Sequence, residues 1–88
     1  MIEDKITISN KAGLHARAAA KLVEVVNQFE SHFEIGSPEK MVDGKSILSI
    51  MLLAASPGTV LDIKLNGNDE LEAFTAINTL VDNKFDEE

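Results

Sequence analysis

Apolar and polar residues alternate along four short segments of the chain, which is the pattern of half-buried β-strands. The first strand is expected within residues 5–9, the second around residues 32–35, a short third strand at residues 40–42 and the fourth at residues 60–65. The inward-facing residues of the three longer strands are then Ile6 and Ile8, Phe33 and Ile35, and Leu61, Ile63 and Leu65.

Between these strands, apolar residues recur every three or four positions, as they do on a helix with one buried face. One helix begins close to His15, a short one runs from an N-cap at Ser46 through Leu53, and a last one follows the turn at residues 66–69. The predicted buried faces of the first and last helices are Ala19, Leu22, Val23 and Val26, and Leu71, Phe74, Ile77, Leu80 and Val81.

The resulting element order is βαββαβα within one domain that spans residues 1–88. Each predicted strand is apolar on one face, and each longer helix carries one apolar stripe. We therefore expect an α+β protein in which the helices cover one face of a four-stranded sheet, an open-faced two-layer sandwich.

Composition excludes several classes of protein. The chain has 15 acidic and 8 basic residues, for a net charge of −7, whereas surfaces that bind nucleic acid or anionic membranes need clustered Lys and Arg. An RNA-binding α/β domain is further disfavoured because the chain has neither Tyr nor Trp for base stacking. The absence of cysteine, of a signal peptide and of a long apolar run favours a cytoplasmic protein. The acidic end, residues 86–88, is expected to be a frayed tail.

His15 lies where the first turn meets the first helix, beside unpaired backbone N–H groups and the positive end of the helix dipole. That environment disfavours imidazolium, so one ring nitrogen remains available as a nucleophile. The same N–H groups suit an anion, and Arg17 adds a planar cation that fits phosphate oxygens. The pattern indicates a histidine that accepts a phosphoryl group.

Simpler interpretations exist for both residues. A histidine before a helix can be an ordinary cap, and Arg17 can be a solvated surface residue. No metal site and no cofactor are expected, since no second ligand lies near His15 in the sequence and there are no cysteines. His32 lies on the polar face of a predicted strand, far from any helix start or arginine, so we expect no chemical role for it.

The segment Leu14-His15-Ala16-Arg17-Ala18-Ala19 resembles the active-site motif of the HPr family, the histidine-containing phosphocarriers of the bacterial phosphotransferase system. A second segment, residues 44–51, resembles the regulatory serine region of the same family, and the resemblance covers nearly the whole chain. Two departures are Ala18, where the family usually has proline, and Ser49, where many members have glycine.

The resemblance implies an antiparallel sheet with strand order 1-4-2-3 and three helices on one side. It implies that His15 accepts the phosphoryl group through Nδ1 and that Arg17 pairs with the phosphate. The phosphoryl group would come from phosphorylated enzyme I and pass to an enzyme IIA, with the chain acting as a monomeric carrier rather than an enzyme. The nitrogen-related branch, NPr, remains an alternative within the family.

Ser46 has two compatible interpretations: an N-cap for the short helix, and the site that a dedicated HPr kinase/phosphorylase modifies in some relatives. The short helix has too many apolar residues to bury them all, and exposed apolar patches commonly mark partner sites. By resemblance, Leu14, Ile47, Leu48 and Met51 form the surface that docks enzyme I and enzyme IIA. A regulatory binding module that works through Ser46 without phosphotransfer is the alternative function, and the presence of both His15 and Arg17 disfavours it.

Overall fold

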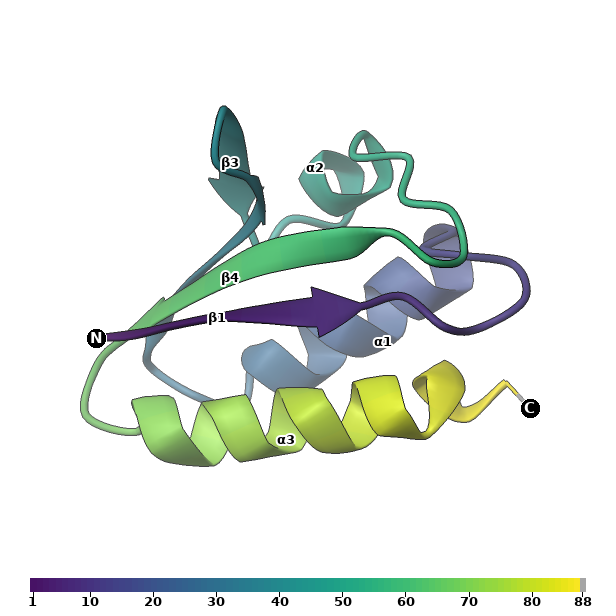
Figure 1. Cartoon of the computed structure of the whole chain (residues 1–88). Coiled ribbons are helices and arrows are strands. Elements are labelled where there is room, and N and C mark those ends of the chain that lie inside the picture. The colour runs from purple at the N-terminus through teal and green to yellow at the C-terminus, as the bar shows by residue number, and fades with distance from the viewer. Residues whose placement is uncertain (88) are drawn as a thin grey trace.

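The sheet in the computed structural model, which describes residues 1–87, has four antiparallel strands (Figure 1). They are β1 (Ile2–Thr7), β2 (His32–Ser37), β3 (Lys40–Asp43) and β4 (Val60–Asn66). The strand order is β1-β4-β2-β3, which confirms the order that the family resemblance implied.

Strand register places the predicted apolar residues opposite one another. Ile35 on β2 pairs with Ile63 on β4, and Phe33 pairs with Leu65, so four large side chains stand on the same face. All four are at most 1% exposed, because this face is the one that the helices cover. The alternation that predicted the strands is therefore confirmed as the alternation between core and solvent.

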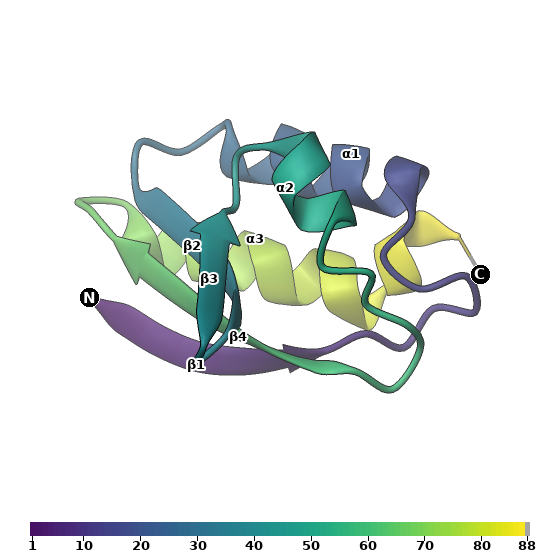
Figure 2. The same cartoon turned by 90° about the horizontal axis from the view of Figure 1, so that it is seen from above.

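Three helices pack against this face: α1 (Ala16–Val26), α2 (Ile47–Met51) and α3 (Glu70–Asp82) (Figures 1 and 2). The buried face of α1 includes the four residues that its periodicity predicted. The short helix α2 begins where expected, after Ser46, and ends two residues before Leu53. Within residues 1–87, none of the helices combines the length and the apolar character needed to cross a membrane.

The predicted buried face of α3 is partly wrong. Leu71 is 63% exposed, and Phe74 is only half-buried. The face that meets the core consists of Ala73, Ile77, Leu80 and Val81. Ala73 was overlooked because its small side chain gives a weak apolar signal, whereas close approach of a helix to a sheet favours a small residue.

The C-terminal segment is packed rather than frayed, contrary to the expectation for the acidic tail. After α3 the chain makes a tight turn, η1 (Lys84–Asp86), in which all three residues have φ between 53° and 62°. Phe85 in this turn is fully buried in the core. We call residues 83–87 the C-terminal strap, and Glu88 lies outside the described residues. Figures 1 and 2 show this end of the chain beside the loop between β1 and α1.

Candidate functional site

The loop before α1 is fixed by a buried asparagine and a glycine. Asn10 is fully buried, and its Nδ2 donates to the carbonyl of Gly13 at 2.7 Å, while the Gly13 N–H donates back to the Asn10 carbonyl at 3.2 Å. Gly13 has φ +72°, and a Cβ there would lie 2.6 Å from the carbonyl oxygen of Ala55. Only glycine fits this turn without displacing the backbone. The loop therefore holds His15 at a defined position.

His15 is the N-cap of α1. Its backbone is extended, its carbonyl accepts the N–H of Ala19 at 2.8 Å, and its ring Nδ1 accepts the N–H of Arg17 at 3.3 Å. A nitrogen that accepts a hydrogen bond carries a lone pair. Nδ1 therefore points toward the N–H groups of the first turn of α1, with its lone pair directed at the end of the helix that favours anions.

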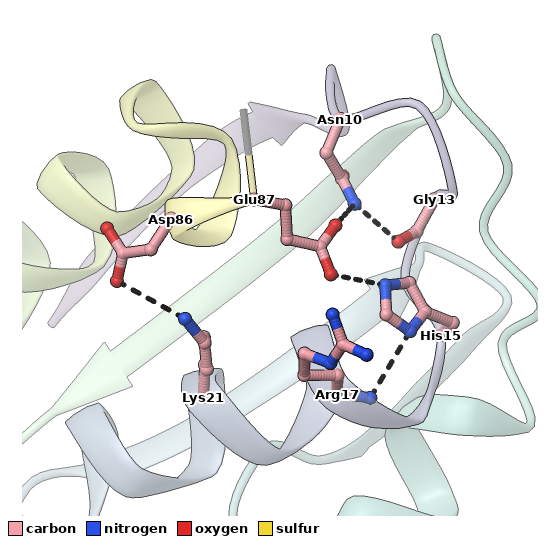
Figure 3. A network of polar contacts seen from close by, with 7 residues as sticks. All are labelled: Asn10, Gly13, His15, Arg17, Lys21, Asp86 and Glu87. Carbon is pink, nitrogen blue, oxygen red and sulfur yellow. Dashed lines mark hydrogen bonds and ion pairs between the residues drawn. The ribbon is translucent and has the colours of Figure 1, made fainter.

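The other ring nitrogen of His15 meets the C-terminal strap (Figure 3). Nε2 lies 2.5 Å from Oε2 of Glu87, and Oε1 of the same carboxylate accepts Nδ2 of Asn10 at 2.8 Å. The side chain of Glu87 is 11% exposed and that of His15 is 33% exposed. Since a carboxylate only accepts, Nε2 carries the ring proton in neutral His15. Both contacts therefore select the tautomer in which Nδ1 is the unprotonated nitrogen.

The surroundings of Glu87 keep it ionised. The hydrogen bond from Asn10 holds the pKa of this carboxyl below its ordinary value of 4.5, partial burial opposes the shift, and the His15 contact and the charge of Arg17 add to it. Because the pKa is lower in the folded state, Glu87 stabilises the fold at neutral pH. That stabilisation is lost as the pH falls through the folded-state pKa.

Arg17 is exposed in the first turn of α1, and Figure 3 shows its side chain beside His15 and Glu87. A shallow depression on this surface is lined by Lys11, Ala12, His15, Arg17 and Glu87. Its charged groups are the basic side chains of Lys11 and Arg17 and the carboxylate of Glu87, which contacts Nε2, while the N-terminus of α1 faces Nδ1. A phosphoryl group on Nδ1 would meet positive charge and N–H donors there.

An apolar patch lies on α2 and the residue that follows it. Its exposed side chains are Ile47, Leu48, Met51 and Leu52, with exposed fractions of 41%, 67%, 39% and 68%. Met51 also lines a second shallow depression together with His15 and residues 54–57, so the patch and the histidine share one surface. We call these four residues the α2 patch.

The residues predicted to dock partners differ in exposure. Leu14 is 4% exposed and packs in the core, and its backbone N–H donates to the carbonyl of Ala55. Leu14 also lines the depression that His15 and Met51 share. Leu52 is the most exposed member of the α2 patch and was not predicted as part of it.

Ser46 is the N-cap of α2, as predicted. Its Oγ accepts the N–H of Ser49 at 3.3 Å, and its backbone carbonyl accepts the N–H of Ile50 at 3.1 Å. The residue is half-buried and directly precedes Ile47 of the α2 patch. The cap is therefore structural, and any charge added to Ser46 would lie beside the patch.

Sequence reasoning missed Asn10 and Glu87, the two residues that support His15 from behind. Asn10 was not singled out in the sequence, and Glu87 was assigned to the acidic tail. The one available signal was Phe85, a large aromatic residue within a charged terminal segment. An aromatic side chain favours burial, and burial of Phe85 brings the neighbouring Glu87 to the site.

The chain is similar to known proteins over nearly its whole length. The family model described as the PTS HPr component phosphorylation site matches residues 2–83. The phosphocarrier protein HPr of Pseudomonas aeruginosa is 50% identical over 84 residues, which cover 94% of this chain and 93% of that protein. The HPr of Xylella fastidiosa is 44% identical over 88 residues, which cover 100% and 99%. A crystal structure of HPr-C-His from Thermoanaerobacter tengcongensis has a TM-score of 0.94 at 43% identity and covers 100% of this chain and 99% of its own.

The solved structure shares the fold of this chain, the curated proteins match it over nearly their whole length, and those proteins are named phosphocarriers. Their names confirm the prediction of a carrier in the phosphotransferase system rather than an enzyme. The chain belongs to the HPr family of phosphocarrier proteins of the phosphotransferase system.

Proposed function

We propose that Nδ1 of His15 accepts a phosphoryl group from phosphorylated enzyme I and passes it to an enzyme IIA. The observation that carries this proposal is the direction of the Nδ1 lone pair. It points at the N–H groups that begin α1, while Nε2 is occupied by Glu87. A nucleophile and an anion site thus coincide at one nitrogen. We place this carrier in the cytoplasm as a monomer.

In the transfer step, the Nδ1 lone pair forms a bond to phosphorus while the bond from phosphorus to the leaving atom of the donor breaks. The ring keeps its proton on Nε2 and takes up positive charge, and the phosphoryl oxygens carry the negative charge. Transfer to the next protein reverses these changes at Nδ1. The N–H of Arg17, which Nδ1 accepts in the free carrier, can then donate to a phosphoryl oxygen.

Arg17 pairs with the phosphoryl group in this proposal, which gives a graded prediction. Arg17→Ala should slow transfer to His15 by about a hundredfold, the scale seen when one charge-stabilising donor is removed. Arg17→Lys should be intermediate, because lysine keeps the charge and loses the planar fork. Rapid-quench measurement of phosphorylated chain gives the three rates. Equal rates would mean that Arg17 is only a surface residue, and unchanged melting temperatures would show that folding is not the cause.

The α2 patch is the docking surface in this proposal. It is apolar, exposed and adjacent to His15, and Met51 at its edge has a flexible side chain that can adapt to partners of different shape. Enzyme I and enzyme IIA would use it in turn. HPr kinase/phosphorylase is the partner that would modify Ser46 beside it.

Ser46 separates the cap role from the partner role. Ser46→Asp should weaken enzyme I binding, because it puts a carboxylate next to Ile47, while its oxygen can still cap α2 and stability stays level. Ser46→Ala should lose about 1 kcal/mol of stability and bind enzyme I normally. Calorimetric titration and thermal melting measure both quantities. Undiminished enzyme I affinity in the Ser46→Asp variant would remove the α2 patch as the docking site.

The proposal as a whole is tested by phosphoryl transfer to the purified chain. Enzyme I and phosphoenolpyruvate should add one phosphoryl group, and mass spectrometry under alkaline conditions should locate it on His15. A group located on any other residue, or no incorporation, would contradict the proposed function.

A further inference from the structure

We propose that Glu87 is a positioning residue for His15: its carboxylate holds the ring proton on Nε2 and stabilises the positive charge that the ring acquires when Nδ1 takes the phosphoryl group. The expected effect of Glu87 on transfer rates rests on the proposed function. The expected position of the ring proton does not, because it concerns the unphosphorylated chain alone. The inference starts from three observations: the contact itself, the way the carboxylate is held, and the way the strap is held.

The contact is specific in its geometry. Oε2 of Glu87 lies 2.5 Å from Nε2, the ring nitrogen opposite the one that faces α1 (Figure 3). A carboxylate on one imidazole nitrogen directs the lone pair to the other and stabilises imidazolium, as the aspartate does in catalytic triads. In this chain, the other nitrogen is the one with its lone pair at the anion site.

The carboxylate cannot turn away easily, because both of its oxygens are used. Oε1 accepts Nδ2 of Asn10, and that same Nδ2 also donates to the carbonyl of Gly13. Asn10 is fully buried, so it is a rigid support. The carboxylate is thus tied to the loop that presents His15, and loop and strap form one unit.

The strap reaches His15 through a turn that residues with side chains rarely adopt. Lys84, Phe85 and Asp86 all have φ in the left-handed region, which costs roughly 1 kcal/mol or more per residue. Such a turn persists only where its surroundings enforce it. Burial of Phe85 does so here, whereas the exposed ion pair between Lys21 and Asp86, at 3.7 Å, contributes little. The turn reverses the chain so that Glu87 faces the histidine instead of solvent.

Once Nδ1 is phosphorylated, the same contact acquires a second effect. The ring then carries a phosphoryl group on Nδ1 and a proton on Nε2, and it is cationic. The carboxylate stabilises this cationic form by keeping the proton on Nε2. A cationic ring is a better leaving group than a neutral one, because the electrons of the N–P bond return to a positively charged ring. Glu87 is therefore expected to favour both loading and unloading of the carrier.

The test compares three variants of the full chain. Glu87→Ala removes the carboxylate, and Glu87→Gln keeps its size but offers one acceptor oxygen to the two donors, Asn10 Nδ2 and His15 Nε2. Asp86→Asn is the matched control: it lies in the same turn, removes a charge that contacts Lys21, and leaves the His15 contact in place. Asparagine also tolerates the left-handed backbone.

The first measurement needs no partner protein. In proton and nitrogen NMR spectra of the unphosphorylated chain, the Nε2–H proton of His15 should appear as a downfield, slowly exchanging resonance. It should be present in the unmodified chain and in Asp86→Asn, and lost to exchange in Glu87→Ala. An equally protected resonance in Glu87→Ala would overturn the proposal, whatever the transfer kinetics are.

The second measurement is the rate of transfer to and from His15. Both Glu87 variants should be slower on the order of tenfold, the lower end of the scale found when carboxylate partners of metal-binding histidines are removed. Asp86→Asn should match the unmodified chain. If Glu87→Gln transfers as fast as the unmodified chain, the charge has no role and the proposal fails. Absence of transfer to His15 in the unmodified chain would instead contradict the proposed function, and the NMR result would still decide the contact.

Discussion

Replacement of His15 by alanine is expected to abolish phosphorylation of the chain by enzyme I and phosphoenolpyruvate. The variant keeps the backbone of the loop, since Asn10, Gly13 and Ala55 hold it without the imidazole. It loses the nucleophile, and no other residue in the described part of the chain combines an imidazole with the N-terminus of a helix. Incorporation of labelled phosphate should therefore fall from one group per chain to none.

His32→Ala is the matched control for this experiment. His32 is the exposed first residue of β2, where it pairs with Asn66 of β4, away from any helix start. Its removal should leave incorporation unchanged. The label in the unmodified chain should be lost in acid and kept in base, as expected of a phosphoramidate. Incorporation that survives in the His15→Ala variant would end the proposal for this histidine.

Most of the fold follows from the spacing of apolar residues, because burial on one face imposes a period on every long element. The strands carry alternating pairs such as Phe33 and Ile35, and these face the core as predicted. The first helix was located by the same reasoning. Periodicity shows which face of a strand is buried, but not which strand lies beside it. The antiparallel order of the strands was therefore predicted only from the family resemblance.

The site was only half predictable for a physical reason. His15 and Arg17 are close in sequence, so helix geometry alone brings them together. Glu87 is 72 residues from His15, and its approach depends on a turn whose backbone angles no local propensity would suggest. Leu14 shows the converse limit: it is adjacent to His15 in the sequence, and only tertiary packing leaves it 4% exposed. Contacts that arise from tertiary packing are those that sequence patterns miss.

In the proposed function, a shared surface would let one small chain serve successive partners. His15 and Met51 line the same shallow depression, so a partner that covers the α2 patch also reaches the histidine. The strap meets His15 through the opposite ring nitrogen, at Nε2. A partner can therefore approach Nδ1 without displacing Glu87, which contacts the other ring nitrogen.

Phe85→Ala is expected to combine the largest loss of stability with a change in the surroundings of His15. The side chain is fully buried, and truncation of such a phenylalanine costs about 3 kcal/mol or more. Without this anchor, the three left-handed residues of η1 lose the burial that offsets their backbone cost, so the strap should detach and take Glu87 away from His15. The variant should then lose the protected Nε2–H resonance although Glu87 is still present.

Phe33→Ala separates the two effects. Phe33 is 1% exposed in β2, far along the sheet from the strap, and its truncation should cost a similar amount of stability. In the folded molecules of this variant, the Nε2–H resonance of His15 should persist. If either alanine variant fails to fold, the corresponding leucine variants test the same contrast with a smaller cavity. Denaturant unfolding gives the stabilities, and the histidine spectrum gives the contact. A Phe85 variant that is destabilised yet keeps the resonance would show that Glu87 reaches His15 without its aromatic anchor.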